Sequence, residues 1–357
     1  MPVDVKRIRE FRLARGLSQE ELGSRIGVTR QTIATWEKGE RKPSVAKLVT
    51  IARELGVPLD LFFEEARANN HALLFRADKP KALTADLRAL LTKQARWYHE
   101  LEVLAGETPA IPEFRPKAEY DPTFVEQVAR EIRDWLGVEE GPLGNVLDLL
   151  ERRGLKVILQ GLPKEVSGFS AYNDKVGAVI FINESHVVER QRFTALHELG
   201  HLVFHRGEYN DPKQISGKND PREKTTNHFA AAVLLPAEAL KAELKGFEKR
   251  WLPIPLLIDL RLRYGVSVRT VLLRASDLGL ITKKRAGQQI GQINKIYGKF
   301  SEPGGPLPQY QTLKRLERLV WKLVLEDKIT LSRAAEVLNE PITDLRKRLR
   351  DWQGVPA

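Results

Sequence analysis

The sequence predicts a multidomain, mostly α-helical fold with a small β-sheet in its central part. At 357 residues, the chain is longer than a single hydrophobic core usually organises. Apolar residues recur at helical spacing along most of it, whereas strand-like segments lie at residues 155–159, 168–172 and 178–182. Two proline-rich stretches, 108–116 and 301–309, are interpreted as linkers because proline stops helices.

These features divide the chain into four parts. Residues 1–64 form a run of short helices, and residues 65–119 form a helical connector that ends in the first linker. Residues 120–282 combine the predicted sheet with helices in an α+β domain. Residues 283–357 form a basic, helical C-terminal region. Helix-turn-helix-like patterns recur in different parts of the chain, although without a fixed period.

The composition restricts the kinds of site and location. No apolar stretch reaches the length of about 18 residues that a membrane span needs, and the N-terminal segment MPVDVKRIRE lacks the apolar core of a signal peptide. We therefore expect a cytoplasmic protein with no membrane partner. The chain has 0 cysteines and 7 histidines, so any zinc must be held by His and carboxylate side chains rather than by thiolates.

The net charge of +11 is concentrated at the two ends of the chain. Residues 1–62 hold 12 Lys and Arg against 8 Asp and Glu, and residues 281–357 hold 15 against 8, whereas residues 63–280 hold 31 of each. This distribution indicates nucleic-acid contacts at the ends and a different task in the neutral middle. Charge alone leaves solvated helix faces as an equally good interpretation.

In the first part, the segment LSQEELGSRIGVTRQTIATWEKGERKPS predicts two helices joined by a tight turn. Ser18 is a good N-cap, and Glu21 follows at the spacing of a capping box. Gly27 permits the turn, and Thr29 caps the second helix, on which Ile33 faces inward.

The second of these helices has the character of a DNA-reading helix. Side chains that project near its N-terminal end, where a recognition helix meets base edges in the major groove, are those of Arg30, Gln31, Thr32 and Thr35. Side chains better placed for phosphates are those of Gln19, Lys38, Arg41 and Lys42. The expected partner is double-stranded DNA.

Residues 5–62 closely resemble the XRE helix-turn-helix family of phage-repressor and Cro-like proteins. The matching residues are Leu17, Ser18, Gln19, Leu22, Ile26, Gly27, Val28, Ile33, Trp36, Glu37, Gly39 and Pro43. The resemblance implies a five-helix DNA-binding domain that regulates transcription. A helical module that binds protein is the alternative, because a fold alone does not fix function.

The central part predicts a short series of helices and strands before the candidate site. In chain order, these are helices at 124–136 and 144–153, a strand at 155–159, and a hairpin whose strands at 168–172 and 178–182 flank a turn at Asn173 and Asp174. Two helices that carry the candidate chemistry follow, and the chain after Pro236 is mainly helical to about Leu280.

The first of these two helices, RQRFTALHELGHLVFH, contains His197, Glu198 and His201. Residues four apart on a helix lie on one face about 6 Å apart along the axis, so two imidazoles can bind one zinc ion with the glutamate beside it. A catalytic zinc also needs a third protein ligand and a position for water, whose proton Glu198 would accept during attack on a peptide carbonyl. His205 lies about 12 Å along the axis from His197, too far to share the metal, and is interpreted as a supporting residue. Core histidines satisfied by hydrogen bonds are the alternative.

The third ligand must come from another element. The next helix, REKTTNHFAAAVLLP, offers Glu223, with Asn227 on the same face. His228 and Asp220 are competitors for this role. His228 lies about 140° from Glu223 around the helix, so at most one of the two faces the metal.

The pattern RFTxxHELGHxxxH followed by ExxxNxFAAxxLLP, within about residues 120–280, is similar to the ImmA/IrrE family of metallo-endopeptidases. The resemblance implies a zincin-like domain, whose substrates include DNA-binding repressors cleaved at a specific site. By motif, it assigns zinc binding to His197, His201 and Glu223, and general-base catalysis to Glu198. The second motif here reads Glu-Lys-Thr-Thr-Asn, whereas the family usually has Ala before the Asn, and this departure leaves the ligand in place.

The motifs do not fix the group that stabilises the oxyanion of the reaction. Tyr172 on the hairpin and His228 are the candidates. A lone Tyr or His is more often structural than catalytic.

The C-terminal pattern ITLSRAAEVLNEPITDLRKRLRDW resembles a helix-turn-helix with its turn at residues 339–341. Residues that would contact phosphates are Arg346, Lys347, Arg348 and Arg350. A solvated surface or a contact within a homodimer is at least as good an interpretation. The segment RYGVSVRTVLLRASDLGLI at 263–281 has a similar pattern, and the family resemblance implies that this region completes the peptidase domain.

The sequence therefore predicts a DNA-binding transcriptional regulator with a zinc metallo-endopeptidase domain that cleaves a repressor protein, with a role in a stress response. One alternative is a non-catalytic regulator that uses the peptidase fold to sense a ligand or bind a protein, although the intact Glu198 argues against it. The other is an antitoxin-like repressor.

Overall fold

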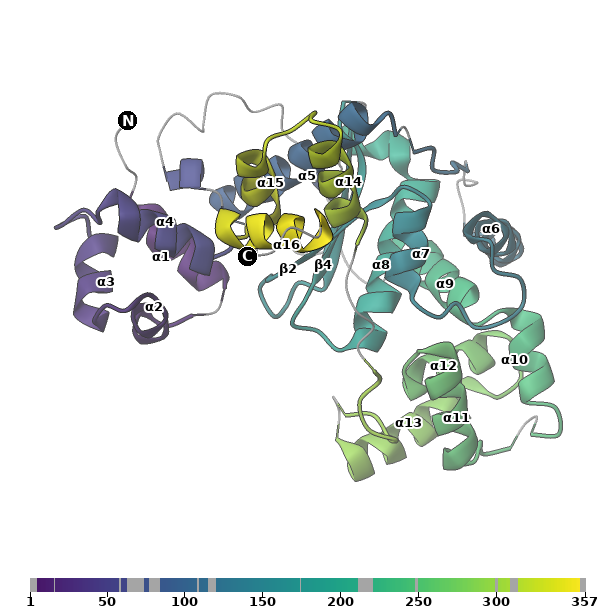
Figure 1. Ribbon diagram of the computed structural model, residues 1–357. Coiled ribbons are helices and arrows are strands. Elements are labelled where there is room, and N and C mark those ends of the chain that lie inside the picture. The colour runs from purple at the N-terminus through teal and green to yellow at the C-terminus, as the bar shows by residue number, and fades with distance from the viewer. Residues whose placement is uncertain are drawn as a thin grey trace.

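The structure is a computed structural model of the chain. It describes residues 5–15, 17–57, 59–62, 74–76, 84–107, 109–114, 120–173, 175–210, 221–247, 250–298, 301–308 and 314–353. The predicted turn residue Asp174, the candidate ligand Asp220 and parts of both linkers lie outside these residues. Figure 1 shows helices at both ends of the chain around a central sheet, which confirms the predicted multidomain, mostly α-helical fold. No helix in the described part is long and apolar enough to cross a membrane.

Among the residues described up to 62, the N-terminal domain has four α-helices and a short 3-10 helix: α1 (Lys6–Ala14), α2 (Gln19–Ile26), α3 (Arg30–Glu37), α4 (Val45–Glu54) and η1 (Leu59–Phe62). The local signals predicted from the sequence determine its turns. Ser18 and Glu21 form a reciprocal capping box, and Gly27 ends α2 in the left-handed conformation with φ of 67°. Thr29 caps α3, and Ile33 on that helix is fully buried.

In the described part of the chain, the central sheet has four strands in the order β1-β3-β4-β2. The strands are β1 (Leu74–Arg76), β2 (Lys156–Gln160), β3 (Gly168–Asn173) and β4 (Gly177–Asn183). β3 and β4 form the predicted hairpin, and β2 pairs with β4 in parallel. β1, which no sequence signal predicted, comes from the connector and pairs antiparallel with β3.

Successive side chains of β3 and β4 point to opposite faces of the sheet, and both faces are buried. Ile180 and Ile182 belong to the core formed with the helices of the central domain, whereas Phe169 and Phe181 belong to the core formed with the N-terminal domain. Ser170 pairs with Ile180 across the hairpin, so its side chain lies on the central-domain face. A polar residue is thereby directed at the helices that carry the candidate site.

The helices of the central domain are α6 (Pro122–Leu136), α7 (Val146–Arg152), α8 (Val188–Phe204), α9 (Pro221–Leu234), α10 (Ala237–Glu243), α11 (Ile254–Tyr264), α12 (Val268–Asp277) and α13 (Lys283–Tyr297), with the 3-10 helix η4 (Arg206–Asn210) after α8. α8 packs on the sheet and against α9. Figure 1 shows α10 to α13 grouped to one side of this layer.

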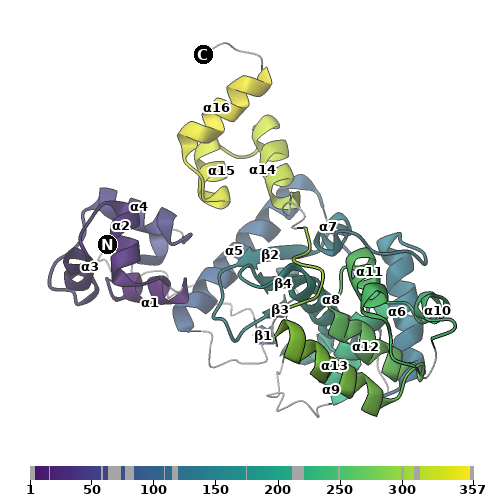
Figure 2. The same cartoon turned by 90° about the horizontal axis from the view of Figure 1, so that it is seen from below.

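One long helix, α5 (Ala85–Ala105), connects the ends of the chain to the centre. Its first half packs with the N-terminal domain and the sheet, and its second half packs with the C-terminal helices. These are α14 (Arg315–Leu325), α15 (Leu331–Leu338) and α16 (Ile342–Gln353). Figure 2 shows α15 and α16 at the outside of the molecule, with α14 next to α5.

A buried ionic cluster fixes α5 to both neighbours. The Glu102 carboxylate of α5 accepts hydrogen bonds from Lys156 Nζ of β2 at 2.7 Å and from Arg315 Nη1 of α14 at 2.5 Å. The side chains of Lys156 and Glu102 are only 2% and 1% exposed. Burial lowers the pKa of Lys156, an effect that the Glu102 carboxylate opposes.

Removing this shared carboxylate is expected to destabilise the protein strongly. Glu102→Ala leaves two buried cations without their common partner, so the free energy of unfolding should fall by about 3–5 kcal/mol in urea denaturation followed by tryptophan fluorescence. Glu238→Ala is the control, because that side chain is 76% exposed in its ion pair with Lys241, and its effect should stay below about 1 kcal/mol. Equal effects of the two substitutions would contradict this role of Glu102.

Candidate metal centre

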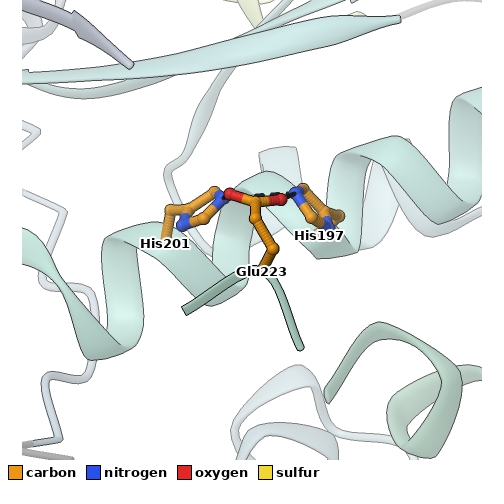
Figure 3. A group of neighbouring side chains, drawn as sticks. All are labelled: His197, His201 and Glu223. Atoms are coloured by element: carbon orange, nitrogen blue, oxygen red, sulfur yellow. Dashed lines mark hydrogen bonds and ion pairs between the residues drawn. The ribbon is translucent and has the colours of Figure 1, made fainter. Parts of the chain in front are cut away.

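Three side chains from two helices converge on one point (Figure 3). His197 and His201 project from the same face of α8, and Glu223 reaches them from α9. The two Nε2 atoms are 3.1 Å apart, and each lies 3.3 Å from one oxygen of the Glu223 carboxylate. Among the described residues, these three form the group of His and acidic side chains whose geometry would hold a metal ion.

The spacing of these atoms fits a zinc ion. Tetrahedral zinc with bonds of about 2.0–2.1 Å places its ligand atoms about 3.3 Å from each other. The donor atoms found here, separated by 3.1 Å and 3.3 Å, have almost this spacing. Glu223 Oε1 is also buried without a hydrogen bond of good geometry, although His201 Nε2 lies 3.3 Å away. Two imidazole nitrogens and an unsatisfied carboxylate oxygen are a donor set that a divalent cation would complete.

The carboxylate of Glu223 is held in its charged form. Burial by itself would raise the pKa of Glu223, but the imidazoles of His197 and His201 beside it outweigh burial and bring the pKa below its usual range. Glu223 is 9% exposed, and His201 is 2% exposed. A metal ligand must be deprotonated, so this environment suits the role predicted for Glu223.

Glu198, between the two histidines, is positioned from the sheet. Ser170 Oγ donates a hydrogen bond to Glu198 Oε2 at 2.5 Å, and Ser170 Oγ also lies 2.7 Å from the hydroxyl of Tyr209. Ser170 is fully buried, and Glu198 is 3% exposed. Sequence reasoning missed both Ser170 and Tyr209. The available signal was a polar residue at an inward position of a strand that is otherwise apolar.

The outer nitrogen of each histidine also has a partner. His197 Nδ1 donates to Asn227 Oδ1 at 3.1 Å, and Nε2 is the nitrogen that faces Glu223. His201 Nδ1 lies 3.4 Å from His205 Nδ1. His205 therefore supports His201 rather than joining the metal ligands, as its distance along the helix predicts.

The two candidate oxyanion residues lie in different surroundings. Tyr172 is two residues after Ser170 on β3 and packs against the ring of Tyr209. His228 uses both ring nitrogens elsewhere, with Nε2 2.7 Å from Glu126 Oε1 and Nδ1 2.8 Å from the hydroxyl of Tyr120. The structure thus brings Tyr172, but not the ring nitrogens of His228, to the side of the sheet where Glu198 is held.

A groove of about 850 Å³ is lined in part by Asn227, the hydrogen-bond partner of His197. Phe193, one turn before His197 on α8, also lines it. Its walls come from α6, α9 and α12, and they include Arg274, which binds the Glu126 carboxylate with two hydrogen bonds. The groove therefore lies on the side of α9 that carries Asn227, and the three metal ligands are not among its lining residues.

The predicted DNA-contacting residues lie on and around α3. The exposed ones are Arg30, Gln31, Lys38, Arg41 and Lys42, and the half-buried ones are Gln19, Thr32 and Thr35. The amide of Gln19 donates to Glu37 at 2.8 Å, and Glu37 also binds Arg12 of α1. Gln19 is thus held in place beside the α3 surface.

The chain is similar to known proteins in the two parts that carry these sites. Residues 8–62 match the family described as helix-turn-helix, and residues 150–276 match a peptidase family described as the IrrE N-terminal-like domain. Both matches confirm the resemblances inferred from the sequence.

Several relatives are uncharacterized HTH-type transcriptional regulators. One from Sinorhizobium medicae is 41% identical over 68 residues, which are 18% of this chain and 49% of the relative. One from Methanothermobacter thermautotrophicus is 57% identical over 49 residues, which are 14% of this chain and 71% of the relative. The chain thus spans about half the length of the first relative. Among solved structures, a Mycobacterium tuberculosis transcriptional regulator is 17% identical with a TM-score of 0.33, covering 52% of this chain and 50% of that one.

The contact from Asn227 to His197 leads to a prediction about metal affinity. Asn227→Ala removes the acceptor that fixes the ring, so zinc affinity measured by competition with a chromophoric chelator should fall by about 10- to 100-fold. Asn227→Asp keeps an acceptor oxygen and should retain the affinity. Asn294→Ala, at a distant Asn that binds Arg269, is the control and should have no effect. Unchanged affinity in Asn227→Ala, in a protein that loses zinc on His201→Ala, would rule out this role.

Proposed function

Since the chain belongs to the family of helix-turn-helix transcriptional regulators and contains an IrrE N-terminal-like peptidase domain, we propose an enzymatic function for it. In this proposal, the protein is a zinc-dependent endopeptidase that cleaves a DNA-binding repressor. The observation that carries the proposal is the convergence of His197, His201 and Glu223 next to a Glu198 carboxylate held by Ser170. In this proposal, the N-terminal domain binds double-stranded DNA and the central domain cuts a protein.

In the proposed mechanism, the metal ion and the protein side chains have different roles. A bound zinc ion would polarise the scissile carbonyl and make water more acidic. Glu198 accepts the proton of the attacking water and passes it to the amide nitrogen that leaves. Ser170 keeps one carboxylate oxygen of Glu198 in place, and the proposed mechanism assigns the proton to the other oxygen. Tyr172, on the same strand face as Ser170, is the proposed donor to the oxyanion.

The groove beside Asn227 suits a polypeptide substrate. Its volume of about 850 Å³ exceeds what a single side chain needs, and its walls offer both apolar and charged groups. Lys224 and Lys283 lie on its rim, whereas Glu126 and Asp277 supply acidic groups. In this proposal, a substrate segment with both apolar and charged side chains binds along the groove, with its scissile bond near Asn227.

Substitution of the proposed base is expected to stop cleavage without loss of the metal. Glu198→Gln should lower the cleavage rate of candidate repressors by at least about 100-fold, because the amide cannot accept the proton. Ser170→Ala should lower it by about tenfold, the effect of losing a hydrogen bond to a charged group. The measurement is single-turnover cleavage with and without a chelator, together with zinc content.

The control for these variants is Ser185→Ala, at a serine that binds Asn183 away from the metal ligands. It should cleave at the wild-type rate. Chelator-resistant cleavage, or full activity of Glu198→Gln, would disprove the proposed peptidase mechanism.

Loss of a proposed base contact should change sequence preference, whereas loss of a proposed phosphate contact should change affinity. Gln31→Ala removes an exposed side chain near the start of α3, so binding sites selected from a random duplex pool should lose their base preference at one position. Lys42→Ala removes a proposed phosphate contact, so affinity should fall uniformly and the salt dependence of binding should decrease by a slope of about 1. If the selected sites are identical for Gln31→Ala and the wild type, α3 does not read bases through this residue.

A further inference from the structure

The C-terminal helices α15 and α16 reproduce the local geometry of the N-terminal α2 and α3. Each matching position lies 312 residues after its counterpart, as Thr330 does after Ser18. α2 and α15 both have 8 residues. The Ser18 hydroxyl accepts the backbone N–H three residues on at 3.1 Å, and the Thr330 hydroxyl does the same at 3.1 Å.

The turns between the helices also agree. Gly27 has φ of 67° and ψ of 46°, and Asn339 has φ of 53° and ψ of 41°. Each left-handed residue is followed by one whose N–H binds a carbonyl five residues back, at 2.8 Å for Val28 and 3.0 Å for Glu340. Asn tolerates this conformation better than other non-glycine residues, which explains how a turn without glycine keeps the same shape.

The second helix of each motif begins three residues after the left-handed residue and is anchored in the same way. Ile33 on α3 and Leu345 on α16 occupy equivalent positions, and both are fully buried. These inward contacts fix which face of each helix points outward. With the same offset of 312 residues that relates Ser18 to Thr330, Gln31, Thr35 and Lys38 on the outer face of α3 correspond to Thr343, Lys347 and Arg350 on α16.

Geometry of this kind does not by itself make a DNA-binding surface. α11 and α12 are joined by a similar turn, with Gly265 at φ of 65° and Ser267 as the N-cap of α12. The outer face of α12 offers no open cation, however, because Arg269 is bound by Asn294 and Glu302, and the exposed residues beside it, Leu273 and Asp277, are apolar and acidic. A second condition, an open basic face, separates α16 from α12.

α16 meets this second condition. Arg346, Lys347 and Arg350 are exposed, and no ion pair of these three is found within the part of the chain that the structure describes. Arg348 differs from them, since it is paired with Glu317 and Glu340. Asp344, in the first turn of α16, lies where an acidic side chain stabilises a helix N-terminus. The exposed acidic residues of α16 are Asp344 and Asp351, so the three unpaired cations leave the exposed charge of this helix positive.

We propose that α15 and α16 form a second helix-turn-helix that binds double-stranded DNA, with α16 in the major groove and its three exposed cations on the phosphates. Figure 2 shows that α14 and α15 hold α16 away from the central domain, so a duplex can approach it. The positive face complements the phosphate backbone. The protein would then contact DNA at both ends of the chain, independently of whether its central domain cleaves a substrate.

The test removes the three cations from the full chain in a background in which the N-terminal motif is weakened by Arg30→Ala and Lys42→Ala. The variant Arg346→Ala, Lys347→Ala, Arg350→Ala is compared by fluorescence anisotropy with a labelled duplex of mixed sequence across a range of salt concentrations. Affinity should fall by about tenfold or more, and the slope of log affinity against log salt should decrease by about 1 for each lost contact.

The matched control removes the same charge from exposed positions outside the motif, with Lys284→Ala, Lys295→Ala and Arg318→Ala. It should leave DNA affinity unchanged. Both variants are checked for unaltered thermal unfolding and zinc content, which separates the proposal from a folding defect and from the peptidase function. Equal affinities of the two variants would overturn the proposal. So would a change in dimerisation of the first variant, measured by light scattering, without a change in DNA binding.

Discussion

The candidate metal centre depends on how closely α8 approaches α9. Gly200, between the two histidine ligands, is the point of contact: a Cβ atom there would lie 3.0 Å from the ring of Phe229 and 3.1 Å from Thr226. Both neighbours are on α9, the helix that delivers Glu223, so a larger residue would push the third ligand away from the other two. Glycine inside a helix costs about 1 kcal/mol relative to alanine, and the close packing of the two helices explains why this cost is accepted here.

The same dependence on packing extends to the sheet, whose two faces serve two parts of the protein. Phe169 and Phe181 stack in the core shared with the N-terminal domain and α5, whereas Ser170, the next residue after Phe169, holds Glu198 on the opposite face. A shift of the hairpin by one residue would exchange these faces and place Ser170 among apolar groups. The position of the proposed catalytic base and the attachment of the DNA-binding domain are thus fixed by one strand register.

The sequence predicts the features that depend on local geometry. It does not predict the features that depend on how helices and strands pack against one another. His197 and His201 are set by helical spacing alone, and the caps at Ser18 and Thr29 follow from side-chain hydrogen bonds within three residues. The choice among Glu223, His228 and Asp220 stayed open to residue-level reasoning, because it depends on which face of α9 meets α8. β1 was missed since three residues of a connector carry no periodicity, and a lone serine in a strand gives no spacing from which a role follows.

The three turns that resemble one another show why local geometry and function must be argued separately. In each of the pairs α2 and α3, α11 and α12, and α15 and α16, a residue in the left-handed conformation ends the first helix. An N-cap residue or a proline then precedes the second helix. Such a turn is a common solution for burying an apolar residue between two helices, as Ile33, Val271 and Leu345 are buried here. What the outward face can bind is decided by the side chains exposed on it. On α12, Arg269 is bound by Asn294 and Glu302, and the exposed Leu273 is apolar, whereas α3 and α16 keep polar or basic side chains exposed. The surroundings of the motif, rather than its backbone, therefore determine whether it supports a peptidase domain or can meet DNA.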